Sequence, residues 1–268
     1  MATAHMPDEF YDLIVHHLPP ERLVSPTGGR PRVGHRVVVR VIWFVLATGN
    51  RWEDVPPELG CSGKTAHRRL RAWEEAGIWD RLHVDLLRLL RQAGKLDTDL
   101  VVIDSVYVRA FGGGEQTDPS PVDRSKLGTK HTLMVSRQGM PFAIRTAGAN
   151  ASDHTQLFPL LLAFPKVEGK PGRPKELPDD LYADRGYDSG STRWLLRWLG
   201  VEPHIAKRNT PHGSGLGKVR WVVERTLSWL KGLRRMRVRY DRLGVIRDAF
   251  TTLAAAVICF HLLHPDAG

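Results

Sequence analysis

The sequence predicts an α/β protein in which a helical region over residues 1–95 precedes a mixed sheet with flanking helices over residues 96–268. Up to residue 95, apolar residues recur at helical spacing. From residue 100, short apolar runs alternate with turn signals and helical segments. The polar stretch at residues 94–99 separates the two patterns and marks the expected domain boundary. A hydrophobic content of 42% over 268 residues is enough for a real core, which excludes a disordered chain.

The charge balance indicates a polyanionic partner. There are 39 lysines and arginines against 29 aspartates and glutamates, which gives a formal net charge of +10. A basic protein of this size typically binds nucleic acid. The alternative is a solvated basic surface that has no partner.

Cysteine usage and apolar runs limit the class of protein further. The two cysteines, Cys61 and Cys259, are far apart, which excludes a disulfide framework and a zinc site. The first ten residues contain acids and no apolar core, so no signal peptide is predicted. The longest apolar run, residues 249–263, is too short to span a bilayer and predicts a buried helix. We therefore expect a cytoplasmic protein.

A basic helix-turn-helix pattern is predicted within the N-terminal region. Residues 52–59 form a short helix, residues 60–62 a turn, and residues 63–76 a second, basic helix. Leu70 and Trp73 would pack inward. The side chains expected to face the major groove of DNA are those of Lys64, Thr65, His67, Arg68 and Arg71. An ordinary helical bundle with one charged face is the alternative, and the order of the elements favours DNA binding.

The remaining elements follow from apolar spacing and turn signals. The basic linker at residues 25–32 either tracks a DNA backbone or is only a loop. Other helices are predicted over residues 9–18, 35–48, 79–91, 153–163, 191–199 and 218–231. Strands are predicted over residues 100–108, 131–136, 141–147, 181–183 and 201–206.

Three carboxylates stand where a metal site would need them. Asp104 interrupts a buried strand, where a charged group is costly unless it binds a cation or a partner. Asp184 follows a short strand and precedes a turn, and Glu224 lies on a predicted helix. Hard cations such as Mg²⁺ take oxygen ligands, and two of them can activate an attacking oxygen for displacement at phosphorus. Taken singly, the three residues also fit an edge carboxylate, a turn residue and a helix salt bridge.

The predicted helix over residues 218–231 has an apolar back and a polar front. Arg220, Glu224 and Lys231 share the front, with the carboxylate between the two cations. A surface ion pair between Arg220 and Glu224 is the simpler interpretation of this helix alone. From residue 207 to residue 242 there are 11 cations and two acids, a density that would bring phosphate to the carboxylates.

Several motifs together resemble one protein family. They include Val102-Ile-Asp104-Ser, Gly128-Thr-Lys-His131, Tyr182-Ala-Asp184-Arg-Gly-Tyr, and Arg220 and Lys231 at fixed distances from Glu224. Over almost its whole length the chain resembles the DDE transposases of bacterial insertion sequences, in particular the insertion-sequence-five family with its RNase H-like catalytic core. Gly217 stands where that family has a tyrosine.

The resemblance implies roles for individual residues. Asp104, Asp184 and Glu224 would form the catalytic triad that binds two Mg²⁺ or Mn²⁺ ions. Arg220 and Lys231 would hold DNA near the cut. Lys130 and His131 lie in a basic stretch of the family and are further candidates for DNA contacts.

The resemblance also implies a reaction and partners. The N-terminal module would read the terminal inverted repeats of the element. The core would hydrolyse a phosphodiester at the element's end, and the freed 3′-hydroxyl would attack target DNA. Such enzymes act as homodimers or larger complexes on DNA, so the resemblance also implies a bacterial protein that associates with the nucleoid in the cytoplasm. The alternative is an inactive or repurposed transposase that regulates by binding DNA, and a nuclease with the same core is a third reading.

Overall fold

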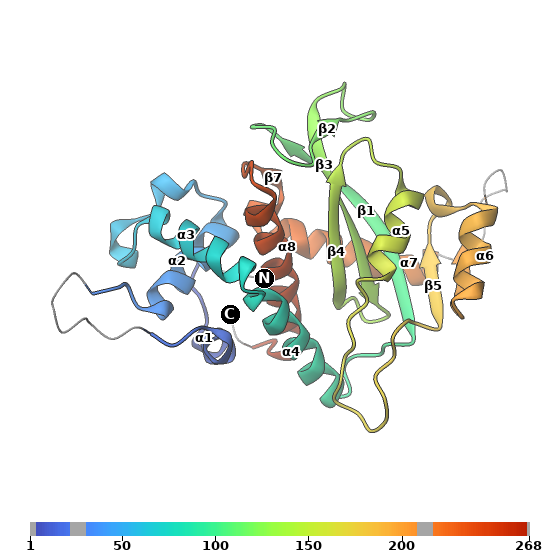
Figure 1. Ribbon diagram of the computed structural model, residues 1–268, viewed down its shortest axis with the longest axis horizontal. Coiled ribbons are helices and arrows are strands. Elements are labelled where there is room, and N and C mark those ends of the chain that lie inside the picture. Colours follow the sequence, from blue (N-terminus) through green and yellow to red (C-terminus); the bar gives the residue numbers. More distant parts are fainter. Residues whose placement is uncertain (1–3, 22–30, 208–216, 267–268) are drawn as a thin grey trace.

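The computed structural model describes residues 4–21, 31–207 and 217–266. Within these ranges, helices of the N-terminal region pack beside a mixed sheet that is flanked by further helices, which confirms the predicted fold class (Figure 1). Most of the predicted linker at residues 25–32 and of the loop before the helix at residue 217 lies outside the described residues.

Four α-helices build the N-terminal region, and all are close to their predicted positions. They are α1 (Asp8–Ile14), α2 (His35–Thr48), α3 (Gly63–Glu75) and α4 (Ile78–Gln92). Ser62 caps α3 by accepting a hydrogen bond from the Thr65 N–H. Leu70 and Trp73 are buried, as predicted.

The prediction of the first helix of the helix-turn-helix is wrong. Residues 52–59 form two separate 3₁₀ turns, Trp52–Asp54 and Pro57–Leu59, and not one helix. Pro56 and Pro57 explain the break, because proline lacks an N–H and keeps the preceding residue extended. The α-helix that precedes α3 is therefore α2.

The sheet is mixed, with one strand reversed among its five main strands. They are β1 (Leu100–Ala110), β3 (Leu127–Ser136), β4 (Pro141–Gly148), β5 (Asp180–Ala183) and β6 (Glu202–Ile205). Strand β3 is antiparallel to β1 and to β4, whereas β5 and β6 run parallel to β1. This is the RNase H-like mixed sheet that the sequence predicted. The two-residue strands β2 (Asp118–Pro119) and β7 (Val238–Arg239) were not predicted, because so short a segment has no period.

Four helices accompany the sheet: α5 (Asp153–Leu161), α6 (Gly190–Trp198), α7 (Gly217–Gly232) and α8 (Gly244–Leu263). Helix α8 lies between the N-terminal helices and the sheet, where it packs against α3, α4 and β4 (Figure 1). By length and composition α8 could cross a membrane, but most of it is buried, which confirms the predicted core helix.

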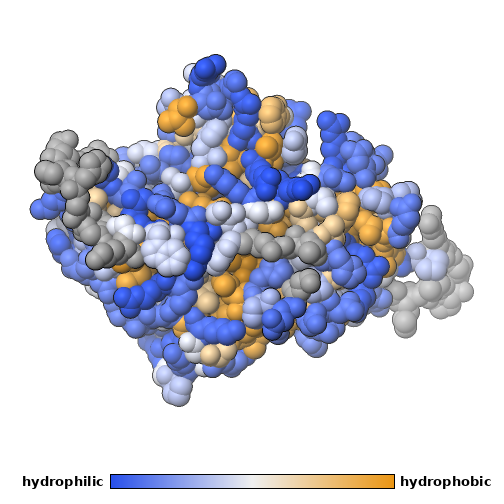
Figure 2. Space-filling view, turned by 180° about the vertical axis from the view of Figure 1, so that it is seen from behind, coloured by the Kyte–Doolittle hydropathy of each residue, from blue (hydrophilic) through white to orange (hydrophobic). Residues whose placement is uncertain are grey.

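One hydrophobic core runs through the described residues. It extends from Phe10 of α1 to Phe260 of α8, whose rings meet edge to face at 5.3 Å. The reverse side of the molecule presents a largely hydrophilic surface with smaller hydrophobic areas between (Figure 2). The sheet is thus held against the N-terminal helices by buried apolar contacts.

Candidate active site

Asp104 and Asp184 occupy equivalent places on neighbouring parallel strands. The register of β1 and β5 pairs Val102 with Tyr182, and each aspartate stands two residues further along its own chain. Adjacent strands lie about 4.8 Å apart, and residues two apart share a face. The two predicted metal ligands are therefore side by side at one end of the strand pair.

Asp104 is half-buried and already has two partners. Its Oδ1 accepts from the Ser105 N–H at 2.8 Å, and its Oδ2 accepts from Arg220 Nη2 at 3.1 Å. Burial raises the pKa of Asp104, and nearby Asp184 raises it too, whereas the Ser105 and Arg220 contacts lower it. The carboxylate is thus in a place where a cation is needed, and Arg220 supplies one.

Asp184 shapes the turn that follows β5. Its side chain accepts from the Gly186 N–H at 2.8 Å and caps the 3₁₀ turn Arg185–Tyr187. A Cβ on Gly186 would lie 2.9 Å from Asp184 Oδ1 and 3.2 Å from Asp153 Oδ2. A larger residue would have to displace these carboxylates, and the same distances bring Asp153 into the neighbourhood of Asp184.

Asp153 is a third carboxylate beside the pair. Ser152 takes the N-cap position of α5, which frees Asp153 for other contacts. Asp153 Oδ1 accepts from Ser105 Oγ and pairs with Lys130 Nζ, both at 3.0 Å. No sequence signal separates such an aspartate from an ordinary first-turn acid, because both follow a serine at a helix start.

Tyr187 is buried beside these acids. Its side chain is 1% exposed. Burial raises its pKa, and the negative charges of Asp153, Asp104 and Asp184 raise it further. The hydroxyl therefore stays protonated beside three carboxylates.

Helix α7 is fixed against the sheet by contacts with the β3–β4 turn. Thr226 Oγ1 donates to the Gly139 carbonyl at 2.8 Å, and Arg225 Nη2 donates to the Gln138 carbonyl at 2.5 Å. Val222, Val223 and Leu230 are buried beneath the helix, as the amphipathic pattern predicted. This packing directs Arg220 at Asp104.

Glu224 and Lys231 are exposed on α7. Glu224 follows Arg220 by one helical turn, so the two residues are neighbours on one face. Among the described residues, no three His, Cys, Asp or Glu side chains are grouped closely enough to hold a metal ion. The expected convergence of three carboxylates is therefore not seen, and it is Arg220 that contacts Asp104.

The donor set at the strand pair nevertheless suits a hard divalent cation. Asp104 and Asp184 present carboxylate oxygens, which Mg²⁺ and Mn²⁺ prefer to nitrogen or sulfur. Arg220 occupies one oxygen of Asp104 with one of its donors, while its Nε–H is buried without a partner among the described residues. A cation can replace the guanidinium at Asp104, because the arginine is held there by a single hydrogen bond.

The predicted DNA-reading residues of α3 are divided between surface and interior. Lys64, Arg68 and Arg71 are exposed, and Arg71 pairs with Glu75 at 2.8 Å. Thr65 is half-buried beside the cap. His67 is half-buried too, because its ring meets the Trp52 ring edge to face at 5.2 Å.

Two expectations about basic residues need correction. His131 is 3% exposed and burial lowers its pKa to about 3, so it is a neutral core residue and presents nothing to DNA. Alternation along β3 explains this, since Lys130 points to the opposite face and reaches Asp153. Arg235 and Arg239 are each 5% exposed, so they stabilise the interior and do not add to a basic surface.

Comparisons with known proteins identify the family of the chain. Residues 6–83 match the family profile of IS4/5-family transposases, and residues 95–259 match the profile of the transposase DDE domain. The chain is 49% identical, over 151 residues, to a protein assigned as the transposase for insertion sequence element IS402 of Burkholderia cepacia. That alignment covers 56% of this chain and 72% of the relative. A second IS402 protein of that organism, itself uncharacterised, is 45% identical over 125 residues, which are 45% of this chain and 84% of that protein.

Solved structures give weaker likenesses. The catalytic core domain of BIV integrase is 16% identical with a TM-score of 0.31, over 64% of this chain and 87% of that chain. The Mos1 mariner paired end complex with Mn is 11% identical with a TM-score of 0.34, over 90% and 80%. Because the DDE-domain profile spans most of the chain, the protein belongs to the DDE transposases of bacterial insertion sequences, enzymes that cut and join DNA and depend on divalent metal ions.

Proposed function

We propose that this transposase binds the terminal inverted repeats of its element, hydrolyses a phosphodiester at each end and joins the freed 3′-hydroxyls to target DNA. Asp104, Asp184 and Glu224 are the proposed catalytic residues. The observation that carries this proposal is the side-by-side placement of Asp104 and Asp184, with Arg220 of α7 already at Asp104. Glu224 is one turn further along the same helix face.

The proposed metal ligands are the carboxylates of Asp104, Asp184 and Glu224. Two Mg²⁺ or Mn²⁺ ions held there would supply charge stabilisation for the attacking and leaving oxygens of an in-line displacement. The chain positions these carboxylates through the register of β1 and β5 and through the contacts that hold α7 against the β3–β4 turn.

Arg220 changes its partner when DNA binds. Its guanidinium leaves Asp104 and moves to a phosphate of the bound DNA, whose oxygens can accept two parallel hydrogen bonds in place of the single one to Asp104. Lys231, exposed on the same helix, adds a second cation for the backbone. The movement frees an oxygen of Asp104 for a cation at the moment when DNA is in place.

The exposed side chains of α3 are the proposed readers of the terminal repeats. Lys64, Arg68 and Arg71 can reach base edges or phosphates of a duplex placed along the helix. A homodimer would pair two such ends, one per protomer, as a cut at both ends of an element requires.

Strand cleavage tests this proposal. A labelled duplex with the element's end is incubated with Mg²⁺ or Mn²⁺ and the full chain, and the conservative variants Asp104→Asn, Asp184→Asn and Glu224→Gln are compared. Each variant should bind the duplex normally but cut about a thousandfold more slowly, equivalent to roughly 4 kcal/mol of lost charge stabilisation. Glu176→Gln, at an exposed loop position, is the matched control and should cut at the normal rate.

The runner-up is a regulator that binds DNA without cutting it. The observation in its favour is that Glu224 is exposed and belongs to no group of three metal-ligating side chains among the described residues. If wild type and Glu224→Gln bind end DNA equally and neither cuts it, the regulator is the correct description.

A further inference from the structure

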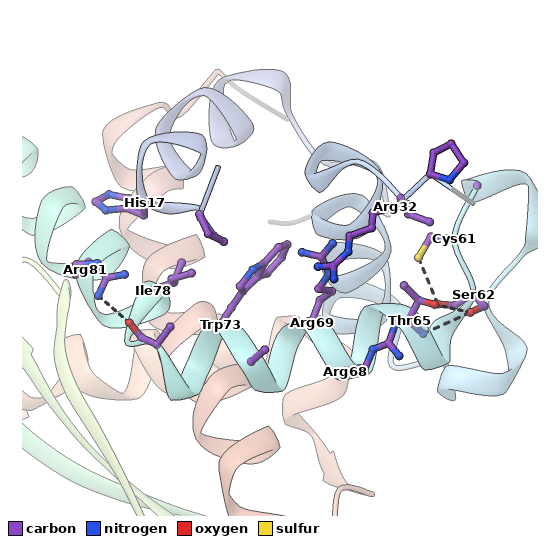
Figure 3. A pocket seen from close by; sticks show the side chains of 16 residues that line it. His17, Arg32, Cys61, Ser62, Thr65, Arg68, Arg69, Trp73, Ile78 and Arg81 are labelled. Atoms are coloured by element: carbon purple, nitrogen blue, oxygen red, sulfur yellow. Dashed lines mark hydrogen bonds between the residues drawn. The ribbon is translucent and has the colours of Figure 1, made fainter. Parts of the chain in front are cut away.

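A hollow of about 930 Å³ lies between α3, the start of α4 and the segment just before α2 (Figure 3). Trp73 and Ile78 form part of an apolar floor. Arginine side chains reach over this floor from separate parts of the chain, as the close view shows. The hollow is on the N-terminal module, apart from the strand pair that carries the catalytic aspartates.

The lining of the hollow is cationic and contains no acid. Arg32, Arg68, Arg69 and Arg81 line it together with His17, and no Asp or Glu does so within the part of the chain that the structure describes. Residues 22–30 of the sequence contain two arginines and no acidic residue, so that segment has no carboxylate to offer. A concave surface to which four arginines and no described acid contribute is complementary to an anion.

The nearest carboxylate is already engaged elsewhere. Glu21 lines a smaller neighbouring hollow with Arg32 and Arg69, and its Oε1 accepts from the backbone N–H of His35 at 2.6 Å. Glu21 therefore supports the start of α2, and its charge acts on Arg69 from outside the larger hollow.

The arginines crowd one another. Burial lowers the pKa of Arg69, and the charges of Arg32 and Arg68 lower it further. The Arg69 guanidinium is held in place over the Trp73 ring, 5.8 Å from its centroid. Like charges fixed at short range are costly, and an anion between them removes that cost.

We propose that this arginine hollow, formed by Arg32, Arg68 and Arg69 over Trp73, binds a backbone phosphate of the duplex that α3 contacts. The proposal rests on the proposed DNA-binding role of the N-terminal module. Guanidinium groups hold phosphate oxygens through two parallel hydrogen bonds, and such contacts fix the register of a protein on DNA without reading sequence. Arg68 belongs both to the exposed face of α3 and to the hollow, so one duplex can meet both surfaces.

The test measures how salt affects duplex binding by the full chain. Fluorescence anisotropy gives the affinity for the element's end and for a scrambled duplex of equal length, over a series of salt concentrations. Arg32→Gln and Arg69→Gln are the variants. Arg32 is exposed, so its substitution leaves the core intact even if Arg69→Gln unfolds. Arg173→Gln, at an exposed and distant loop position, is the matched control for the loss of one positive charge.

Each variant should weaken binding to both duplexes by the same factor, about fivefold at 0.15 M salt, and should reduce the log–log salt slope by about 0.9. The control should change neither quantity. An unchanged affinity and slope for Arg32→Gln overturns the proposal, as does weaker binding to the element's end alone, which would mean base reading.

Three further outcomes separate the proposal from the alternatives. Calorimetric titration with inorganic phosphate distinguishes a small-anion site, because tight phosphate binding that the variants abolish without affecting DNA affinity overturns a backbone contact. If the wild-type chain cuts end DNA and both Arg32→Gln and Arg69→Gln keep full affinity, phosphate binding in the hollow is overturned and the proposed function is not. A chain that binds neither duplex overturns both.

Discussion

At the scale of single residues, the ion pair between Arg220 and Asp104 is the contact on which the site depends. It joins residues 116 positions apart, and both side chains are largely shielded from solvent. The sequence indicated each partner but assigned Arg220 to DNA. The pairing itself could not be predicted, because it depends on how α7 is placed across β1, and no local pattern encodes that placement.

Replacing Arg220 should make the metal site easier to fill. In Arg220→Gln, no ion pair at Asp104 has to break before a metal ion can bind there. Arg220→Gln should therefore bind Mn²⁺ about fivefold more tightly in the absence of DNA, equivalent to roughly 1 kcal/mol. Calorimetric titration with Mn²⁺ measures this, with Arg197→Gln, which breaks a surface pair with Glu202, as the control. Equal or weaker Mn²⁺ binding by Arg220→Gln would contradict the account.

Glu74 of α3 should make the stability of the protein depend on pH. Burial raises its pKa from 4.5 to about 7, and nearby Asp80 and Asp248 raise it too. The folded state thus keeps a proton up to about pH 7 that the unfolded state loses near pH 4.5. Stability should fall as the pH rises through this window, because the folded state binds more protons there.

Substitution of Glu74 by glutamine should remove this penalty. Since the carboxylate is partly solvated, screening reduces the effect to about 1 kcal/mol, and Glu74→Gln should raise the Tm at pH 8 by about 2–4 °C. At pH 4 the two proteins should melt together, because the glutamate is then protonated in both states. Thermal melts at the two pH values check this, and a gain of equal size at pH 4 would show another cause.

At the scale of elements, the turn between β3 and β4 determines where α7 lies. Gly139 has φ +89°, and a Cβ there would come within 2.7 Å of Arg225 Nη2, 3.0 Å of Thr226 Oγ1 and 3.2 Å of Val222 Cγ1. The sequence predicted the two strands that flank this turn, yet not that a helix much later in the chain would rest on the turn. The two-residue strand β7 was missed for a related reason, since its pairing with the distant strand β1 forms it.

Gly139→Ala should destabilise the protein beyond the cost of an unfavourable φ. Gly172 is the matched control, because its φ is +99° and a Cβ there meets nothing within 4 Å. Gly139→Ala should cost about 1–2 kcal/mol more than Gly172→Ala, through the displaced contacts of α7. Urea denaturation of the two variants measures the difference, and equal costs would mean that α7 tolerates the added methyl.

At the scale of the whole molecule, the two matched regions share their interior. Helix α8, at the end of the chain, packs on α3 and α4 as well as on β4. Arg235 adds a polar link, since it donates to the Asn50 carbonyl at 3.0 Å and pairs with Asp241 at 2.7 Å. The predicted boundary near residue 95 marks a change in pattern along the chain. Because α8 covers apolar surface of the N-terminal helices, this packing opposes independent folding of residues 1–95.

The first 95 residues expressed alone should therefore lack a cooperative thermal transition, because the apolar faces that α8 covers become exposed. Circular dichroism melts of this fragment and of the full chain make the comparison. Co-expression with residues 96–268 should restore a cooperative melt. A sharp transition of the fragment alone, within a few degrees of that of the full chain, would show an autonomous domain.

The central claim, that Asp104, Asp184 and Glu224 share one metal site, is tested most directly by locating the metal along the chain. Fe²⁺ bound in place of Mg²⁺ on end DNA, with ascorbate and peroxide, generates radicals that cut the polypeptide close to the ion, and fragment masses identify the cuts. The account predicts cuts near residues 104, 184 and 224 that Mg²⁺ suppresses. Cuts near residues 104 and 184 without any in α7, or cuts near residue 153 in their place, would contradict it.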